Sequence, residues 1–217
     1  MPHLLVIEAS PRGDQSVSRD MAAHFVDQWL SANPDGTIVR RDLSGTALQF
    51  TNAAWLEAYF TPPDQQTPAM KAALALSDEL VAELVKADVL AIGTPVYNYN
   101  VPAVLKSWFD HVVRKGITLG FDGAGLLGSR RCAVLVASGG VYTPGSPIAD
   151  RDFATQWLRL ILNVLGIDDV AFVAAGGTKV IDLKQQSREA YMAPILAAVS
   201  DTARRAVAME AHRHDPA

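Results

Sequence analysis

Short apolar runs alternate along the chain with longer segments in which apolar and polar positions are mixed. The runs cover residues 3–9, 37–43, 88–94, 131–138 and 170–176. Four of these five runs are nearly continuous in hydrophobicity. That pattern is typical of parallel strands buried on both faces, because strands with one solvated face alternate apolar and polar residues. We therefore predict five strands in a parallel sheet.

The segments between these runs repeat apolar residues every three or four positions. Residues at that spacing share one face of a helix, so each repeat marks the face that packs on the core. We expect five helices, the last of them over about Leu183–Met209. The expected core faces of the other four are Met21, Phe25 and Trp29; Leu76, Leu80, Val81, Leu84 and Val85; Val101, Val104, Leu105, Trp108 and Val112; and Phe153, Trp157, Leu160, Ile161 and Val164.

Strands and helices in alternation favour right-handed crossovers and an α/β sandwich with helices on both faces of the sheet. Five strands indicate the doubly wound, flavodoxin-like order 2-1-3-4-5. No internal repeat or low-complexity linker interrupts this pattern. We therefore expect residues 1–217 to form a single domain.

Two segments depart from the regular alternation. The longest irregular stretch covers residues 44–68, and its aromatic side chains favour a packed excursion over disorder. These side chains are Trp55, Tyr59 and Phe60. The polar end, about residues 210–217, is expected to fray. His212 and His214 lie there without a further ligand nearby, so we expect no metal site.

Composition narrows the classes of partner. The 217 residues are 49% hydrophobic and 19% charged, and the formal net charge is −4. A chain of this length can bury a large core. Its acidic balance gives no general attraction to nucleic-acid phosphates or anionic lipid, and no basic run exceeds the pairs Arg130-Arg131 and Arg204-Arg205. We expect neither a nucleic acid nor a membrane as a partner.

The single cysteine, Cys132, bears on the cellular compartment. One cysteine cannot form an intrachain disulfide, and its apolar neighbours favour a small buried hydrophobe over a reactive thiol. No apolar run approaches the ~18 residues of a membrane helix, and the first residues are too polar for a secretory signal. These features predict a soluble protein of the cytoplasm.

The predicted topology also indicates where a ligand binds. Ligands of doubly wound sheets sit beyond the carboxyl ends of the strands, where the strand order reverses. For the order 2-1-3-4-5 this point lies between the first and third strands. The loops to consider are residues 10–20 after the first strand, residues 94–110 after the third and residues 138–146 after the fourth.

The first of these loops carries Ser10, Ser16 and Ser18 ahead of a predicted helix. Free backbone N–H groups and the helix dipole favour an anion there, and serine hydroxyls donate to phosphate oxygens without adding charge. A terminal monophosphate would fit this loop. An N-capping role for Ser16 or Ser18 is the alternative, but capping accounts for only one serine. Arg12 and Arg19 either add positive charge or face solvent.

Residues 123–128, GAGLLG, match the dinucleotide-binding pattern G-x-G-x-x-G. That pattern binds a pyrophosphate only after a strand and at the start of a helix. Here it precedes a predicted strand, so we interpret it as a glycine-rich turn. The chain also lacks the motifs G-x-x-x-x-G-K-[ST], G-x-S-x-G and H-E-x-x-H. Kinase and hydrolase functions therefore lose their usual support.

The segment 94–102, TPVYNYNVP, places an unusual mixture of residues between a strand and a helix. Pro95 is expected to end the strand, and Pro102 is expected to lie in the first turn of the helix, with Asn100 as its cap. The backbone N–H groups of residues 96–99 would then stay free for a ligand.

A flat heteroaromatic ring needs donors and acceptors at its edge and an aromatic wall against its face. Tyr97 and Tyr99 can supply the wall, and the amide of Asn98 both donates and accepts. Gly139 and Gly140 let backbone N–H groups approach an acceptor closely. The alternative is that the two tyrosines pack in the core beneath an ordinary loop.

Four stretches, VIEASPRGDQSVSR, PVYNYNVPAVLKSWFDHVVRKGITLGF, SGGVY and GIDDVAFVAAGG, resemble the flavodoxin-like FMN-dependent NADH:quinone oxidoreductases, also called azoreductases. The resemblance extends from residue 3 to about residue 205. It implies bound FMN and a homodimer whose two active sites lie at the subunit interface. It implies Ser10, Ser16, Val17 and Ser18 around the phosphate; Pro95, Val96, Tyr97, Asn98 and Tyr99 along the isoalloxazine; and Ser138, Gly139, Gly140 and Val141 at the pyrimidine side.

Two departures from the family pattern border the substrate pocket. Family members often have Ser-Arg-Gly-Gly where residues 137–140 are Ala-Ser-Gly-Gly, so a cation beside the flavin is missing. The loop after residues 116–118 is shorter than usual, and Phe121 stands near the place of a tyrosine. We expect His111 to be a structural or surface residue of its helix and no side chain to act as a nucleophile. The residues expected to order substrates are Tyr97, Asn98, Phe121 and Tyr142.

The resemblance implies a ping-pong reaction. NADH or NADPH would transfer a hydride to the flavin and leave, and a quinone or an aromatic azo compound would then take the same place and accept two electrons. A flavodoxin-type electron carrier and an NAD(P)H:flavin reductase are alternatives with the same cofactor. A protein that binds another phosphorylated ligand without redox chemistry is a further alternative.

Overall fold

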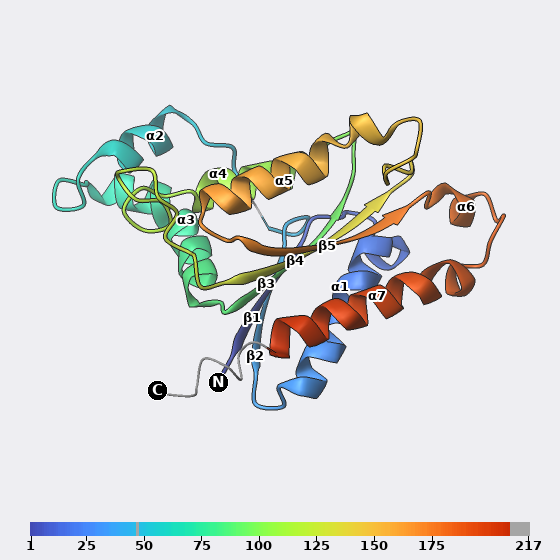
Figure 1. The fold of residues 1–217 in the computed structure, drawn as a ribbon. Helices are drawn as coiled ribbons and strands as arrows, with labels where there is room; N and C mark the ends of the chain where they lie inside the picture. The colour runs from blue at the N-terminus through green and yellow to red at the C-terminus, as the bar shows by residue number, and fades with distance from the viewer. Residues whose placement is uncertain (47, 209–217) are drawn as a thin grey trace.

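The computed structural model describes residues 1–46 and 48–208 and is drawn in Figure 1. One parallel sheet has the strand order β2-β1-β3-β4-β5, which confirms the predicted topology. The strands are β1 (His3–Glu8), β2 (Thr37–Asp42), β3 (Val89–Pro95), β4 (Arg131–Ser138) and β5 (Asp169–Gly176).

Burial across the sheet explains the hydrophobic pattern of the strands. Every residue of β3 and of β4 is buried, as is β1 after His3, because these three strands have a neighbour on each side and helices over both faces. The outer strands β2 and β5 are more exposed. The nearly continuous apolar runs therefore mark the central strands.

Helices cover both faces of the sheet, as predicted (Figure 1). α1 and α7 pack on one face and enclose one core, and α3, α4 and α5 pack on the other. The helices are α1 (Val17–Ala32), α2 (Ala53–Phe60), α3 (Pro68–Lys86), α4 (Ala103–Val112), α5 (Phe153–Val164), α6 (Lys179–Asp182) and α7 (Arg188–Ala208). Two short 3-10 helices are η1 (Gly13–Gln15) and η2 (Ala149–Arg151).

The periodic apolar residues predict the core face of α1 correctly, but that of α3 only in part. Met21, Phe25 and Trp29 of α1 are fully buried. In α3 the buried face runs from Leu74 to Leu84, and Val85 is 39% exposed. Val81 is 4% exposed as expected, so the prediction fails only for Val85, in the last turn of α3.

The predicted core face of α5 was wrong in part, because Trp157 and Ile161 do pack against the core. Three of its expected core residues, Phe153, Leu160 and Val164, are 57%, 61% and 36% exposed. The buried residues of α5 are instead Ala154, Leu158 and Leu162, which repeat every four positions. This helix is apolar around much of its circumference, so periodicity alone does not decide which stripe meets the sheet. We call Phe153, Leu160 and Val164 the outer stripe of α5.

Two further helix boundaries differ from the prediction. Val101 lies before α4 rather than inside it. The last helix, α7, begins at Arg188 rather than at Leu183, because the chain turns at Lys184, which has a left-handed φ of 56°. The short helix α6 lies before the expected range and was not predicted. Met209, the expected frayed end and the pair His212 and His214 lie outside the described residues.

The excursion at residues 44–68 is packed through Trp55 and Tyr59, whereas Phe60, the third expected aromatic residue, is 72% exposed. It contains α2, whose Trp55 is 7% exposed and stacks on Tyr59 with ring centroids 5.2 Å apart. His111 holds the start of the excursion in place, with its Nε2 2.8 Å from the carbonyl oxygen of Gln49. His111 is 3% exposed and therefore structural, as expected.

The glycine-rich segment 123–128 is a turn, as predicted. It precedes β4, and a Cβ on Gly125 would lie 2.1 Å from the backbone nitrogen of Gly166. Cys132 in β4 is buried, and burial raises the pKa of its thiol well above the usual range. Among the described residues, no helix is both long and apolar enough to cross a membrane.

Candidate functional site

The loops after β1, β3 and β4 meet at the carboxyl edge of the sheet. The N–H of Ala9 donates to the carbonyl of Gly93 at 3.0 Å, and the N–H of Val96 donates to that of Ala137 at 2.8 Å. These bonds continue the parallel register of the strands into the loops. The position is the one at which doubly wound sheets bind their ligands.

Gly93 brings the start of α1 close to β3, a role that the sequence analysis missed. A Cβ at this position would lie 2.9 Å from the carbonyl oxygen of Ser18 and 3.3 Å from the Cβ of Ala22. A glycine inside a strand often marks such a close approach, so this signal was available in the apolar run at residues 88–94.

The first loop forms a corner of neutral hydrogen-bond donors. Ser10, Ser16 and Ser18 are all buried, and the Oγ atoms of Ser16 and Ser18 are 3.2 Å apart. The N–H groups of Val17 and Ser18 belong to the first turn of α1, where an α-helix offers no acceptor. Hydroxyls and N–H groups together are a suitable donor set for a phosphate.

Ser16 also caps α1, because its Oγ accepts from the N–H of Arg19 at 3.3 Å. Capping thus accounts for one serine of the corner and leaves Ser10 and Ser18 unexplained. Arg19 does not face the corner with a free charge. Its guanidinium donates to the carbonyl of Ser10 at 2.7 and 2.9 Å and to Asp42 at 2.7 Å.

Arg12 is likewise paired. Its Nη2 donates to the Oδ1 of Asp182 at 2.9 Å, and this bond is the main reason why the pKa of Arg12 is raised. A smaller electrostatic effect on the pKa of Arg12 comes from Tyr97, which places that tyrosine near the first loop. The donors left for an anion are therefore the neutral ones.

Residues 97–100 form a tight turn, which corrects the expectation that the backbone N–H groups of residues 96–99 all stay free. The N–H of Tyr97 donates to Asn100 at 2.8 Å, and the N–H of Asn100 donates back at 3.0 Å. Asn98 and Tyr99 have left-handed φ values of 50° and 68°, the conformation of a two-residue type I′ turn. The N–H groups of Val96 and Tyr97 donate to backbone carbonyls. Of residues 96–99, only Asn98 and Tyr99 therefore have a backbone N–H without an acceptor within the described part of the chain.

The expected capping of α4 by Asn100 was wrong. The side-chain oxygen of Asn100 accepts from the N–H of Val101 at 2.8 Å, and α4 begins after Pro102 without a side-chain cap. The two-residue turn places Asn100 too early in the chain to reach the first turn of the helix. Pro95 is the last residue of β3, as expected.

Both tyrosines of the turn lie at the surface. Tyr97 is 38% exposed and Tyr99 is 45% exposed, so the alternative in which they pack in the core does not hold. The carbonyl of Tyr99 accepts from the N–H of Ala154 at 3.1 Å, which ties the turn to the start of α5. The backbone of the turn is therefore held against the start of α5, with both rings at the surface.

The loop after β4 is held by the chain that follows β5. The carbonyl of Ser138 accepts from the N–H of Thr178 at 3.0 Å, and that of Gly140 accepts from the N–H of Gly177 at 3.1 Å. The Ser138 hydroxyl also donates to the Gly140 carbonyl at 2.7 Å. The N–H groups of Gly139 and Gly140 have no acceptor among residues 1–46 and 48–208 and remain available to a ligand.

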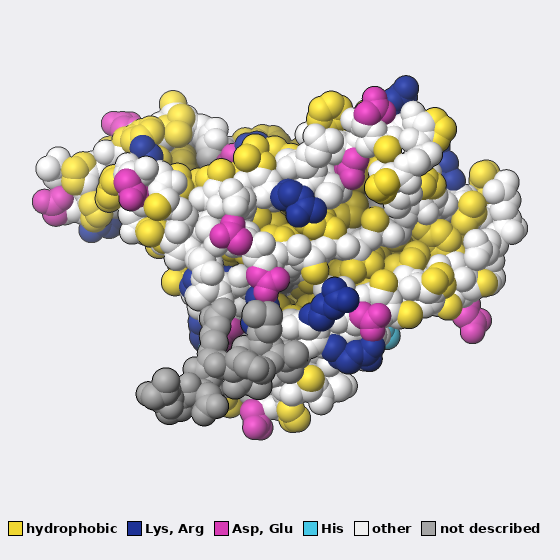
Figure 2. All heavy atoms as spheres, in the orientation of Figure 1, with side chains coloured by type: hydrophobic (Ala, Val, Ile, Leu, Met, Phe, Trp, Pro, Cys, Tyr) yellow, Lys and Arg dark blue, Asp and Glu magenta, His cyan; other side chains and the backbone are white. Residues whose placement is uncertain are grey.

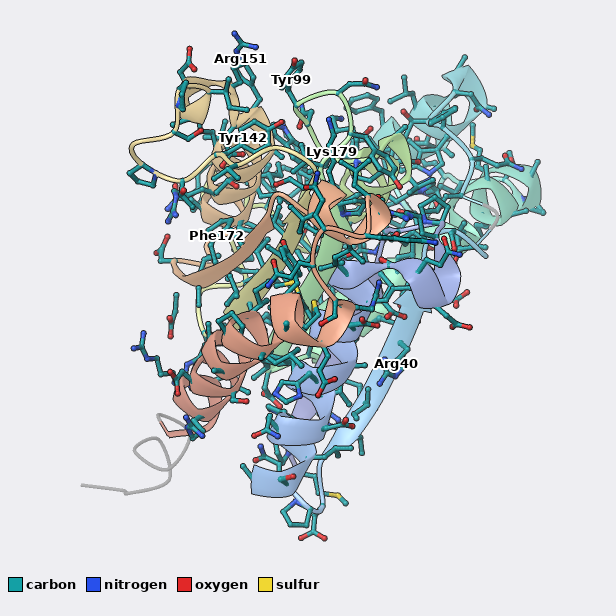
Figure 3. All side chains as sticks on the ribbon, turned by 90° about the vertical axis from the view of Figure 1, so that its right-hand side faces the viewer. Arg40, Tyr99, Tyr142, Arg151, Phe172 and Lys179 are labelled. Atoms are coloured by element: carbon teal, nitrogen blue, oxygen red, sulfur yellow. The ribbon has the colours of Figure 1, made fainter. Side chains whose placement is uncertain are left out.

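Two side chains lie over the glycines of this loop. A Cβ on Gly139 would be 3.1 Å from the Cε of Lys179, and one on Gly140 would be 3.1 Å from the ring of Tyr142. Figure 3 shows Tyr99, Tyr142 and Lys179 at the same end of the molecule. Lys179 was missed by the sequence analysis, because the backbone bonds that bring α6 to this loop join residues far apart in the chain.

Phe121 is not brought together with the other candidates. Its ring lies 3.2 Å from the position of a Cβ on Gly116 and is 84% exposed. Hydrogen bonds tie its loop to the hydroxyl of Tyr59 and to the carbonyl of Leu165. Among the described residues, no hydrogen bond joins residues 116–126 to the loops after β1, β3 or β4.

Known proteins resemble the chain over nearly its whole length. Residues 2–199 match the family described as having a flavodoxin-like fold. FMN-dependent NADH:quinone oxidoreductase 2 of Jannaschia sp. is 60% identical over 90% of this chain and 96% of its own length. FMN-dependent NADH:quinone oxidoreductase 8 of Burkholderia lata is 55% identical over 95% of this chain and 99% of its own.

A solved structure agrees with these relatives. The FMN-dependent NADH-azoreductase of Bacillus anthracis, in complex with FMN, superposes with a TM-score of 0.83. It is 26% identical in sequence, and the superposition covers 94% of this chain and 99% of the azoreductase.

Proposed function

Since the chain belongs to the flavodoxin-like family of FMN-dependent NADH:quinone oxidoreductases, we propose that it transfers two electrons from NADH or NADPH, through bound FMN, to quinones or aromatic azo compounds. The observation that carries this proposal is the neutral donor corner at Ser10, Ser16 and Ser18, which adjoins the exposed tyrosines 97 and 99 at the switch point of the sheet. The serines would hold the phosphate of a ligand, and the neighbouring tyrosines would hold its flat ring.

The residues present fit FMN. Its phosphate would be held by the hydroxyls of Ser10, Ser16 and Ser18 and by the N–H groups of Val17 and Ser18, because Arg12 and Arg19 are occupied by carboxylates. Pro95, Val96, Tyr97, Asn98 and Tyr99 would line the isoalloxazine. The pyrimidine side would lie against Ser138, Gly139, Gly140 and Val141.

FMN supplies the redox chemistry when it is bound, and the chain binds, orients and stabilises charge. The N–H groups of Gly139 and Gly140, which have no acceptor in the described part of the chain, would stabilise negative charge at the ring edge. Tyr97, Asn98 and Tyr142 order the flat substrates at the open rim. Donor and acceptor occupy this one space in turn, which makes the reaction ping-pong, and no side chain acts as a nucleophile.

We propose that the protein works as a homodimer with the outer stripe of α5 in the interface. Phe153, Leu160 and Val164 expose apolar surface on one side of this helix. Leu160 of the stripe, Ile167 and Val170 also line a groove of about 760 Å³, most of whose other lining residues are polar or charged. Figure 2 shows hydrophobic side chains gathered in the hollow over β5, between α5 and α7. Apolar surface of this extent on a soluble protein supports an interaction surface.

The dimer would place the active sites at the interface. α5 begins beside Tyr99, since the N–H of Ala154 donates to the Tyr99 carbonyl. A second copy that packs on the outer stripe therefore approaches Tyr99. Within one copy Phe121 stands apart and highly exposed, so we assign its expected substrate-ordering role to the partner subunit's Phe121.

The single buried cysteine supports a reducing compartment, the cytoplasm.

Steady-state kinetics test this function. Purified protein is supplied with FMN, and NADH consumption is followed with and without a benzoquinone. We expect NADH oxidation that depends on both FMN and quinone, with parallel double-reciprocal lines as the quinone concentration is varied. A yellow protein that forms a stable one-electron semiquinone and does not turn over NADH would instead be an electron carrier. A protein that binds no flavin would contradict the proposal.

A further inference from the structure

The short helix α6 connects two loops of the candidate site. Near its end, Asp182 accepts from Arg12 of the loop after β1 at 2.9 Å. At its start, Lys179 lies against Gly139 of the loop after β4. Under the proposed function, these loops hold the phosphate and the pyrimidine side of FMN. The position of α6 is therefore fixed relative to both ends of the cofactor.

The stem of the Lys179 side chain lies along the loop, although the residue as a whole is exposed. Its Cγ, Cδ and Cε atoms would be 3.4, 3.7 and 3.1 Å from a Cβ on Gly139. Three successive stem atoms at contact distance mean that the stem follows the backbone of residue 139. The bonds from Gly177 and Thr178 to Gly140 and Ser138 fix the backbone from which this stem starts.

The ammonium of Lys179 has no anionic partner of its own. Among the described residues it forms no salt bridge and no hydrogen bond. Asp182, the nearest acidic residue on the same helix, is paired with Arg12. The pKa of Asp182 is lowered by the hydrogen bond and charge of Arg12 and by the charge of Arg188. A cation without a carboxylate thus adjoins a loop with two free N–H groups.

We propose that Lys179 places its ammonium at the pyrimidine side of bound FMN and stabilises the reduced cofactor. This inference rests on the proposed function. A hydride from NADH carries two electrons and one proton, so NADH becomes NAD⁺ and neutral oxidised flavin becomes a reduced flavin with one negative charge. Lys179, at the start of α6, would then supply the cation beside the loop at Ser138 and Gly139.

The test compares three forms of the FMN-loaded protein: wild type, Lys179→Gln and Lys179→Arg. The ratio of affinities for reduced and oxidised FMN follows from the potential of the bound cofactor, measured by spectroscopic titration against a redox dye. An opposite charge within ~4–6 Å changes the ionisation of its neighbour by about one to three pKa units. We take the lower end because Lys179 is exposed.

For Lys179→Gln we expect the ratio to fall about tenfold, which lowers the two-electron potential by about 30 mV. Binding of oxidised FMN should change less than about twofold, and Lys179→Arg should keep the wild-type ratio. Lys86→Gln is the matched control, because it removes the same charge at the end of α3, near the amino ends of the strands.

Two results would overturn the inference. An unchanged ratio in Lys179→Gln overturns it while the proposed function stands. An equal fall in Lys86→Gln also overturns it, because the effect would then come from net charge alone. Wild-type protein that binds no FMN overturns this inference and the proposed function together.

Discussion

The hydroxyl oxygens of Ser16 and Ser18 are 3.2 Å apart at the start of α1, and both side chains are buried. Ser16 is also the N-cap, but the Ser18 hydroxyl has no partner other than Ser16 among the described residues. A buried hydroxyl at a helix start, with free N–H groups beside it, is a distinctive donor for an anion. The phosphate corner can therefore be tested at Ser18 without loss of the cap.

Ser18→Ala should weaken FMN binding about tenfold or more, because a hydrogen bond to a charged group contributes roughly 1.5–3 kcal/mol. The free energy of unfolding should change by less than about 1 kcal/mol. Quenching of flavin fluorescence gives the dissociation constant, and urea denaturation gives the stability. Ser31→Ala, at the other end of α1, is the control and should leave the affinity unchanged. Equal affinities of the wild type and Ser18→Ala for FMN would show that the phosphate does not bind at this corner.

Asn98 separates a backbone effect from a side-chain effect. Its left-handed φ of 50° suits asparagine or glycine, so Asn98→Gly keeps the turn and removes only the amide. We expect Asn98→Gly to reduce kcat/KM for quinone at least tenfold at nearly constant stability. Asn98→Ala should lose the same activity and, in addition, about 1 kcal/mol of stability through strain. Full activity in Asn98→Gly would show that the Asn98 amide has no role in the reaction and that the residue serves only the turn.

Asp42 gives a prediction for pH dependence. Burial acts to raise the pKa of Asp42, but hydrogen bonds from Arg19 and Ser44 outweigh it, and the pKa is lowered. A carboxylate with a lowered folded-state pKa stabilises the fold above its unfolded pKa of about 3.9 and loses that contribution as the pH falls through the folded value. The side chain is 43% exposed, so the contribution should stay below about 1 kcal/mol.

Asp42→Asn should therefore be slightly less stable than the wild type at pH 7. The difference should shrink as the pH falls below about 4, the range in which wild-type Asp42 becomes protonated. Urea denaturation at a series of pH values measures it. Asp27→Asn on the exposed side of α1 removes the same charge without an ion pair and should show no such difference. A difference that grows on acidification would contradict the lowered pKa.

The outer stripe of α5 predicts the state of association. Phe153→Glu combined with Leu160→Glu should convert a dimer into a monomer of 23.3 kDa, because two charges would be buried in an apolar interface. Sedimentation velocity measures the mass. Phe60→Glu changes an aromatic residue on α2 that is even more exposed, and it should leave the dimer intact. A dimer that survives the double change, or a wild-type monomer, would refute this interface.

The strand pattern predicts the fold well because each central strand is buried on both faces. Val89 to Pro95 is buried without interruption and almost wholly apolar, because helices and neighbouring strands surround it. The face of α5 could not be predicted in this way. Leu158 and Leu160 are equally apolar in the sequence, and only the packing of the helix on the sheet buries the first and exposes the second.

The candidate site was predictable where neighbouring residues build it and unpredictable where distant segments meet. Ser16 and Ser18 lie in one loop, so helix-start rules single them out. Lys179 reaches Gly139 only because the N–H of Thr178 bonds to the carbonyl of Ser138, forty residues earlier. The type I′ turn at residues 97–100 contains no glycine, and its non-glycine left-handed residues gave only a weak signal.

A crystal structure of the protein with FMN tests the central claim most directly. The account predicts the FMN phosphate within hydrogen-bonding distance of the Ser16 and Ser18 hydroxyls, and the isoalloxazine between the turn at residues 97–100 and the loop at residues 138–141. FMN bound at another place, or a crevice that stays without flavin at saturating FMN, would contradict it.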